Sequence, residues 1–487
     1  MVIDTSKYRI IIGLEVHVQV KTDSKIFCGC STAFGAEPNS HTCPKCTGMP
    51  GALPVLNKKV VEYAIKTAIS TGCRIAPSSI FARKNYFYPD LPKNYQISQY
   101  EQPLAENGFV EINVEGVKKK IELIRIHLEE DAGKLIHVTG EGSLVDFNRT
   151  GTPLMEIVTT PCITSSLEAY EYLVTLKRIL RYIGVSECDM EKGSLRCDAN
   201  ISIKPQGEPG LGVKTEVKNM NSFKGIQRAL DYEAGRQMEV LEEGGKILQD
   251  TRLWDEKSGR TVSMRSKEEA HDYRYFPEPD LVPVIISADW INEVRSTMPE
   301  LPHARYCRFM TEYGLSDYDA GVLTAEKEIA DYYENCLLLG KTGKEEKERC
   351  KMVANWVMGD LLRHLNEENK TINDSPVSPE MLVSMIGFMD KGTISGKIAK
   401  EVFSQMYDSG DSPAVIIKEK NLVQVSDESE IVRIVEEMIN ENKDIVKRYR
   451  TGEEKVFGFL VGQLMKKSKG KVNPAIANKI LLEKLQK

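Results

Sequence analysis

The chain has 487 residues, of which 41% are hydrophobic and 28% charged, and its formal net charge is −6. This length exceeds what one hydrophobic core usually supports, so we expect two or three domains. The sequence has no apolar run near the roughly 18 residues that a membrane span requires, and its first residues lack the pattern of a signal peptide. These features argue against a membrane protein and predict a cytoplasmic one.

Strands dominate the predicted structure up to about residue 295. Residues 8–21 alternate strictly between hydrophobic and polar side chains, and residues 195–204 and 212–218 repeat the pattern. In the first segment the hydrophobic positions are Ile10, Ile12, Leu14, Val16, Val18 and Val20, and the polar positions are Glu15, His17 and Gln19. The alternation predicts an antiparallel sheet with one buried and one polar face. Helices are expected between the strands at residues 166–184 and 224–245, which makes the fold α+β.

Four cysteines follow the first predicted strand with the spacing C-x-C-x12-C-x2-C: Cys28, Cys30, Cys43 and Cys46. Four thiolates suit the tetrahedral coordination of Zn²⁺, although His41 is an alternative ligand. A metal whose four positions are all taken by protein has no open position for a substrate. We therefore expect a structural zinc site that clamps this loop. Because the chain has 11 cysteines, an odd number, and no predicted signal peptide, a disulfide framework is not expected.

The remainder of the chain has helical periodicity, for example at Ile398, Val402, Phe403 and Met406. A linker is expected at residues 408–413, and the last helix is expected to start at Asn473 and Pro474. The predicted domains are therefore residues 1–295, an all-α domain at 296–410 and a small α-helical tail at 411–487. Residues 444–487 hold eleven Lys and Arg against four Asp and Glu. This excess of positive charge is typical of a surface that binds nucleic acid, and the alternative is an ordinary solvent-exposed surface.

The polar face of the predicted sheet carries residue types that are unusual in strands, since Asp and Asn are depleted there. These residues are Glu15, His17, Arg196, Asp198, Asn200 and Glu216. Carboxylates are preferred ligands of Mg²⁺, and Arg and Lys neutralise phosphate, so the face predicts a pocket for a cation and an anion.

Two further segments are candidates for the same pocket. Residues 125–134 supply Arg125, His127 and the pair Glu129 and Glu130, and residues 147–158 supply Arg149, Thr152 and Glu156. Strict alternation from His127 places Glu129 on the polar face and turns Glu130 away, unless the strand bulges or ends there. The sequence has no P-loop, because Asn335 stands where the first glycine would be, and it has no G-x-S-x-G elbow or protein-kinase motif set.

Several long motifs in order, however, resemble one family, the B subunit of the bacterial and archaeal glutamyl/aspartyl-tRNA amidotransferase. They include "IIGLEVHVQVKTDSKIFC", "RKNYFYPDLPKNYQISQY", "HLEEDAGK", "DFNRTGTPLMEIV", "GSLRCDANISI", "EVKNMNSF", "DYRYFPEPDL" and the final "GFLVGQLMKKSKGKVNP". The resemblance covers nearly the whole chain. It implies a cradle domain with a kinase-like site, a helical domain and a mobile tail that grips tRNA.

The resemblance also implies ligands, partners and residue roles. It implies ATP and Mg²⁺ at Glu15, His17, Glu130 and Glu156, which favours Glu130 where alternation favours Glu129, and it agrees with a structural zinc. From their own chemistry, and not from the resemblance, Arg196 and Lys214 are candidates for phosphate binding, and Asp198 and Asn200 for a second metal or the substrate. The lysines expected to contact tRNA are Lys466, Lys467, Lys469 and Lys471. The implied partners are a glutamine-hydrolysing amidase subunit and a small third subunit, in a heterotrimer.

The activity implied by the resemblance is ATP-dependent amidation of Glu-tRNA(Gln), Asp-tRNA(Asn) or both. An alternative from a different class is a zinc-containing RNA-binding protein without catalysis. That alternative explains the cysteines and the basic tail but leaves the carboxylates on the polar face unexplained, because they repel RNA. A stand-alone ATP-dependent ligase is a third possibility, and it lacks a source of ammonia.

Overall fold

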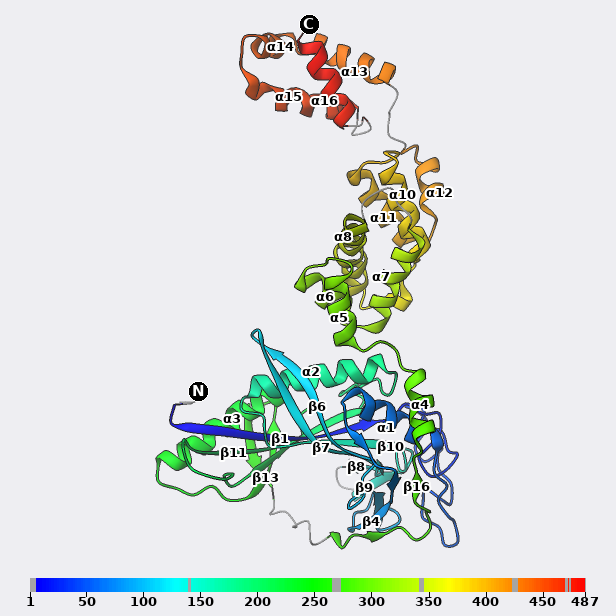
Figure 1. The fold of residues 1–487 in the computed structure, drawn as a ribbon, viewed down its shortest axis with the longest axis vertical. Helices are drawn as coiled ribbons and strands as arrows, with labels where there is room; N and C mark the ends of the chain where they lie inside the picture. Colours follow the sequence, from blue (N-terminus) through cyan, green and yellow to red (C-terminus); the bar gives the residue numbers. More distant parts are fainter. Residues whose placement is uncertain are drawn as a thin grey trace. The chain divides into compact units, whose positions relative to one another are not determined.

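The computed structural model describes residues 6–138, 142–264, 273–340, 346–422, 428–468, 472 and 474–486. The chain forms two compact units, Met1–Pro302 and His303–Lys487. The first contains the sheets and the second is helical, so the predicted α+β class is confirmed (Figure 1). The predicted helix start at Asn473 lies outside the described residues. Among those that are described, no helix combines the length and the apolar character needed to cross a membrane.

A nine-stranded sheet with β1 (Tyr8–Gln19) at its centre organises the first unit. The strands predicted at 8–21, 195–204 and 212–218 pair antiparallel, as expected. Every other neighbouring pair with a described register is also antiparallel except β12 (Thr215–Lys218) and β13 (Asp250–Asp255), which run parallel. In spatial order the strands are β14 (Arg260–Ser263), β13 (Asp250–Asp255), β12 (Thr215–Lys218), β11 (Leu195–Pro205), β1 (Tyr8–Gln19), β10 (Pro153–Thr159), β7 (Val117–Glu130), β6 (Ala105–Val114) and β2 (Arg74–Ile75).

The first unit also contains three smaller sheets. They pair β15 (Phe276–Pro277), β4 (Ala82–Asn85) and β5 (Tyr95–Ser98); β16 (Val284–Ile285) with β3 (Ser78–Ser79); and β8 (Lys134–Val138) with β9 (Gly142–Asp146). The three-stranded sheet joins segments almost 200 residues apart, because Phe276 pairs with Arg83. It therefore brings the residues around Tyr275 next to those around Lys84.

Helices cover the hydrophobic face of the large sheet (Figure 1). The alternating residues of β1 from Ile10 to Val18 are all buried, and they share one hydrophobic core with α2 (Ser166–Tyr182) and α3 (Phe223–Glu242). Ser165 and Ser222 cap α2 and α3, and α3 stops just before Gly244, whose φ is +75°. The helices of this unit are α1 (Lys58–Ser70), α2 (Ser166–Tyr182), α3 (Phe223–Glu242) and α4 (Ala288–Ser296). Since one face is filled by helices, the opposite face of the sheet is left for polar residues.

The buried residues of the second unit form two hydrophobic clusters that share no residue. The first extends from Phe309 to Ile417 and the second from Ile431 to Leu485. The linker predicted at 408–413 is shorter in the structure, because α11 (Gly396–Ser409) and α12 (Pro413–Glu419) include its two ends. Ile416 and Ile417 of α12 belong to the first cluster.

The helical elements are α5 (Pro302–Thr311), α6 (Asp317–Leu323), α7 (Lys327–Leu339), α8 (Glu346–Trp356), a π-helical turn (Val357–Leu361), α9 (Leu362–Glu367), a 3₁₀ turn (Ile372–Asp374), α10 (Pro379–Asp390), α11 (Gly396–Ser409), α12 (Pro413–Glu419), α13 (Glu428–Glu441), α14 (Lys443–Arg450), a 3₁₀ turn (Glu454–Val456), α15 (Phe457–Lys467) and α16 (Pro474–Leu485). The helical periodicity predicted around Val402 is confirmed, because α11 buries all four residues that defined it.

Candidate active site

The polar face of the large sheet collects ionisable side chains from four adjacent strands. Antiparallel register aligns them in rows that cross β7, β10, β1 and β11. One row consists of Arg125, Val158, Glu15 and Asp198, and the next consists of His127, Glu156, His17 and Arg196. Residues from four separate segments of the sequence therefore lie side by side on one surface.

A pocket of about 520 Å³ opens over these rows. Three of its side chains, His17, Glu129 and Glu156, bring ligand atoms within 4.8 Å of one another. His17 Nε2 lies 3.6 Å from Glu129 Oε1 and 3.6 Å from Glu156 Oε2. Buried His127 lies 3.0 Å from Glu156 through its Nε2 atom. Two carboxylates and an imidazole at this spacing form a donor set that suits a divalent cation.

Glu156 is an ionised carboxylate in this environment. Burial alone raises the pKa of Glu156, but the neighbouring His127, His17 and Lys84 outweigh it and hold that pKa well below its usual range. The carboxylate is therefore available as a metal ligand over the physiological pH range.

Glu15 lies in the adjacent row, and its pKa is shifted in the opposite direction from that of Glu156. Burial raises the pKa of Glu15, and the carboxylates of Glu156, Glu216 and Asp198 raise it further. Asn200 donates a hydrogen bond from Nδ2 to Glu15 Oε1 at 3.0 Å. Since negative charges surround this carboxylate, a bound cation would stabilise its ionised form.

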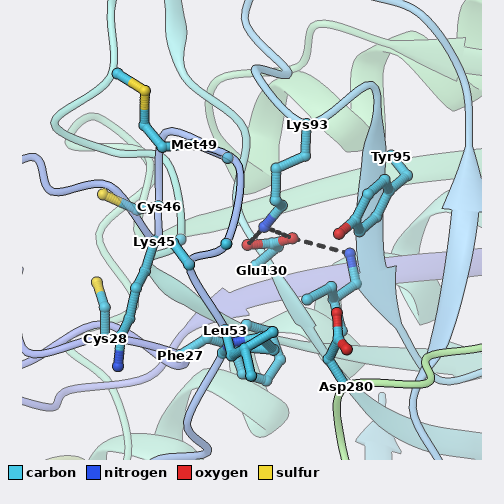
Figure 2. A pocket seen from close by; sticks show the side chains of 16 residues that line it. Phe27, Cys28, Lys45, Cys46, Met49, Leu53, Lys93, Tyr95, Glu130 and Asp280 are labelled. Atoms are coloured by element: carbon cyan, nitrogen blue, oxygen red, sulfur yellow. Dashed lines mark hydrogen bonds and ion pairs between the residues drawn. The ribbon is translucent and has the colours of Figure 1, made fainter.

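The two neighbouring glutamates at the end of β7 point to different places. Glu129 lies in the pocket with His17, as alternation predicted. Glu130, which the family resemblance favoured, is not brought into this group. Its carboxylate accepts hydrogen bonds from the Lys93 ammonium, with Oε2 at 2.6 Å, and from the backbone N–H of Ile97 at 2.9 Å. Figure 2 shows this pair in a second pocket of about 220 Å³.

Some of the residues predicted to bind phosphate or substrate already form ion pairs within the protein, and one does not. Arg196 donates from Nη2 to Asp131 Oδ2 at 2.6 Å, so its charge is already neutralised by a buried carboxylate. Asp198 is held in the same way by Lys218. Lys214, in contrast, is exposed at the pocket, and among the described residues it has no hydrogen bond or ion pair. Of the predicted cations, Lys214 is thus the one left open to a ligand.

Aromatic and basic residues that the sequence patterns did not predict also line the pocket. We call Lys84, Tyr100, Tyr273 and Tyr275 the aromatic wall. Tyr100 and Tyr275 are stacked, with ring centroids 4.2 Å apart and an angle of 8° between the rings. Lys84 Nζ lies 4.8 Å from the ring centroid of Tyr273. Burial disfavours the charged form of Lys84, yet Glu129 and the other anionic groups around it raise the pKa of Lys84. Tyr273 and Tyr275 lie close together in "DYRYFPEPDL", and this pair was the available signal in the sequence.

The four cysteines of the predicted zinc site come together in space. Their sulfur atoms lie within 4.8 Å of one another, and the His41 ring is not in the group. Cys43 and Cys46 Sγ atoms are 3.9 Å apart, near the roughly 3.8 Å edge of a Zn–sulfur tetrahedron. A hydrogen bond from Cys28 is the main reason that the pKa of Cys46 is lowered to about 4, and the Lys25 ammonium lowers it further. The cluster therefore fits a metal, and Figure 2 shows that Cys28 and Cys46 line the second pocket.

The chain matches the GatB/GatE catalytic domain over residues 10–292 and the GatB domain over residues 338–485. It is 58% identical to the B subunit of the aspartyl/glutamyl-tRNA(Asn/Gln) amidotransferase of Geotalea daltonii, over 99% of this chain and 100% of the relative. The chain belongs to the GatB family. The B subunits of the same amidotransferase from Carboxydothermus hydrogenoformans and Geobacter sulfurreducens are each 56% identical, over 99% and 98% of this chain and 99% of each relative. The resemblance found in the motifs is thus confirmed.

The GatB-domain match includes the basic end of the chain. Lys466 and Lys467 form the last turn of α15, whereas Lys469 and Lys471 lie outside the described residues. Lys467 is paired with Glu441 at 2.6 Å and with Glu437 at 3.3 Å. Lys466 is exposed, and no partner of it lies in the described part of the chain. Of these two lysines, Lys466 is the one available to a nucleic-acid backbone.

Proposed function

We propose that this chain is the subunit of a tRNA-dependent amidotransferase that activates a side-chain carboxylate with ATP. The substrate is Glu-tRNA(Gln), Asp-tRNA(Asn) or both, and the products are Gln-tRNA(Gln) and Asn-tRNA(Asn). The observation that carries the proposal is the grouping of His17, Glu129 and Glu156, beside Glu15, in one pocket. The pocket lies within the residues that match the GatB/GatE catalytic domain, and the relatives are named as one subunit of such an amidotransferase.

The chemistry requires an activated carboxylate. A carboxylate is a poor acyl donor because its leaving group would be oxide or hydroxide. A carboxylate oxygen therefore takes the γ-phosphoryl group of ATP and ADP leaves. Ammonia then attacks the carbonyl carbon of the acyl phosphate, inorganic phosphate leaves, and the nitrogen loses a proton. Two anions must meet in the first step, so positioning and charge neutralisation are the main tasks of the protein.

Magnesium is the metal that fits this task. His17, Glu129 and Glu156 would hold it, with Glu15 as a neighbouring carboxylate, and we assign Glu129 rather than Glu130 because Lys93 already occupies Glu130. When bound, Mg²⁺ would reduce the repulsion between the γ-phosphate and the substrate carboxylate. Lys214 is positioned to contact phosphate oxygens, and Asn200 orients Glu15 through its hydrogen bond. Arg196 keeps a structural role, since it neutralises Asp131.

Zinc is proposed as a structural ion at Cys28, Cys30, Cys43 and Cys46. Four sulfur donors fill a tetrahedral site and leave no position for a substrate. The ion would fix the loop between Cys28 and Cys46, and Lys25, which is fully buried, would stabilise the thiolates through Cys46 at 3.7 Å. The cysteines would thus serve stability and leave the chemistry to the polar face.

The chain would work as one subunit of a heterotrimer. Ammonia would come from a glutamine-hydrolysing amidase subunit, and a small third subunit would complete the complex. The last helices would dock tRNA through basic residues such as Lys466. The subunit designation in the names of the relatives supports this arrangement.

The test is an ATP-cleavage assay on the purified complex, with and without misacylated tRNA. We expect ATP cleavage that depends on Mg²⁺ and on Glu-tRNA(Gln) or Asp-tRNA(Asn), followed by formation of the amidated product. Binding of tRNA without any ATP cleavage would instead support the alternative, a zinc-containing RNA-binding protein without catalysis.

A further inference from the structure

The cations around the large pocket differ in whether the protein already neutralises them. Lys218 and Arg196 are neutralised by Asp198 and Asp131. Arg125 lines the same pocket, and in the described part of the chain it has neither a hydrogen bond nor an ion pair. Its Nε atom is buried without an acceptor. A buried donor without a partner costs free energy, so Arg125 is a group that a ligand oxygen would stabilise.

Arg125 is held in place by an aromatic wall. Its guanidinium carbon lies 5.5 Å from the ring centroid of Tyr100, and Tyr100 stacks on Tyr275. Lys84, which also has no hydrogen bond or ion pair to a described residue, lines the pocket with Arg125. A guanidinium placed against an aromatic face keeps its donors in a fixed plane, which suits bidentate binding of a planar oxyanion.

The position of Arg125 on the sheet separates it from Lys214, another pocket cation without a partner among the described residues. Arg125 is at the β7 end of its row, with uncharged Val158 between it and Glu15. Lys214 precedes β12, on the far side of β10, β1 and β11, and two of the proposed metal ligands, Glu156 and His17, come from strands between the two cations. The pocket therefore offers two separate anion sites flanking one metal site.

We propose that Arg125, with Lys84 and the stacked Tyr100 and Tyr275, forms an oxyanion subsite that binds the side-chain carboxylate of the aminoacyl group. This assignment rests on the proposed function and adds to it the residue that recognises the acceptor. The phosphates of ATP are left to the metal and to Lys214. A carboxylate presents two coplanar oxygens, which match the fork of a guanidinium, whereas Lys84 contributes a point charge beside it.

The subsite predicts that the enzyme distinguishes a carboxylate from an amide on the same tRNA. We would measure the affinity of the complete complex for Glu-tRNA(Gln) and for Gln-tRNA(Gln) by filter binding without ATP. A charged hydrogen-bonded pair predicts that the wild type binds Glu-tRNA(Gln) roughly tenfold to 100-fold more tightly. Arg125→Gln should reduce this ratio to near one without changing the affinity for Gln-tRNA(Gln). Arg125→Lys should retain part of the ratio, because it keeps the charge and loses the fork.

A matched variant separates carboxylate recognition by Arg125 from a general effect of removing a positive charge. Arg74→Gln removes an arginine of the same sheet that is exposed and paired with Glu106, and it should leave the ratio unchanged. Glutamine hydrolysis by the complex reports that each variant is folded and assembled.

Two results would overturn the assignment of Arg125. One is an unchanged ratio in Arg125→Gln. The other is a raised KM for ATP with the ratio intact, which would assign Arg125 to phosphate. Absence of tRNA-dependent ATP cleavage in the wild type would refute the proposed function instead, and the binding ratio does not depend on that assay.

Discussion

Two pockets of the first unit use adjacent glutamates in opposite ways. In the smaller pocket Glu130 is buried against Lys93, and the charges cancel within the protein. In the larger pocket Glu129 and Glu156 lie beside His17, while three of the lining cations, Lys84, Arg125 and Lys214, have no hydrogen bond or ion pair to a described residue. The comparison separates charges that stabilise the fold from charges that are left for ligands. It also shows why the number of charged residues in a pocket is a poor guide to its function. What matters is whether each charge is already paired within the protein or is available to a ligand.

The largest expected effect comes from the metal ligands of the larger pocket. Glu156→Gln or Glu129→Gln should lower tRNA-dependent ATP cleavage by roughly 100-fold or more, because a catalytic metal supplies several kcal/mol of charge stabilisation. Both variants should also bind Mn²⁺, used as a spectroscopic substitute for Mg²⁺, more weakly than the wild type. Glutamine hydrolysis by the partner should be retained.

Glu130→Gln is the matched variant for this comparison, because it changes the next residue on the same strand. It should leave the affinity for Mn²⁺ unchanged. If Glu130→Gln weakened Mn²⁺ binding and Glu129→Gln did not, the assignment of the metal to Glu129 would be wrong and the expectation drawn from the family would be right.

The smaller pocket predicts a large effect on stability. Lys93→Met leaves the Glu130 carboxylate buried without its cation, which should lower the free energy of unfolding by about 3–5 kcal/mol. The double variant Lys93→Met/Glu130→Gln should recover much of this loss, because it removes the unpaired charge. Denaturant unfolding of the purified chain is the measurement. Lys118→Met, which breaks an exposed pair with Glu111, should cost no more than about 1 kcal/mol.

The sequence predicts the sheet face better than it predicts the pocket built on it. Alternation in residues 8–21 identified the buried and polar faces of β1, because a strand has a fixed period of two. The same period placed Glu129 correctly relative to His127. The cysteine cluster followed from spacing alone, since its two pairs are local in sequence.

The rest of the pocket depends on contacts that have no local signal. Lys84 and Tyr275 meet because β15 pairs with β4, and no periodicity links segments so far apart in sequence. The neutralisation of Arg196 depends on Asp131, which follows the last residue of β7. Sequence patterns report which face a residue occupies, whereas pairing of charges requires the tertiary structure.

The cysteine cluster offers a test that spares the larger pocket. Cys46→Ser should release zinc and lower the melting temperature, because metal binding and local folding are coupled. Bound zinc can be counted by atomic absorption, and the melting temperature measured by calorimetry. At a temperature where the variant stays folded, ATP cleavage should remain close to that of the wild type. Loss of catalysis with zinc and melting temperature unchanged would contradict the structural role.

Removing the last helices of the chain should weaken tRNA binding and leave catalysis intact. A truncation after residue 422 removes the hydrophobic cluster of Ile431 to Leu485 and keeps α12, whose Ile416 and Ile417 are buried in the preceding cluster. We expect the KM for charged tRNA to rise by roughly tenfold or more, as several phosphate contacts are lost. Turnover should largely return at saturating tRNA. A KM equal to that of the full chain would show that these helices do not dock tRNA.

The smallest expected effect is on the salt dependence of tRNA binding, and it should differ between two neighbouring lysines. One of them is paired within the protein and the other is not, as with the charges in the two pockets. Lys466 is exposed and without a described partner, whereas Lys467 is held by Glu441 and Glu437. If Lys466 contacts a tRNA phosphate, Lys466→Gln should reduce the slope of log affinity against log salt by roughly 0.7–0.9, the value for one counterion released per contact. Lys467→Gln should change the slope less, because its charge is already neutralised within the helices. Filter binding over a salt series measures both slopes, and equal changes in the two variants would show that pairing does not determine which lysine meets the backbone.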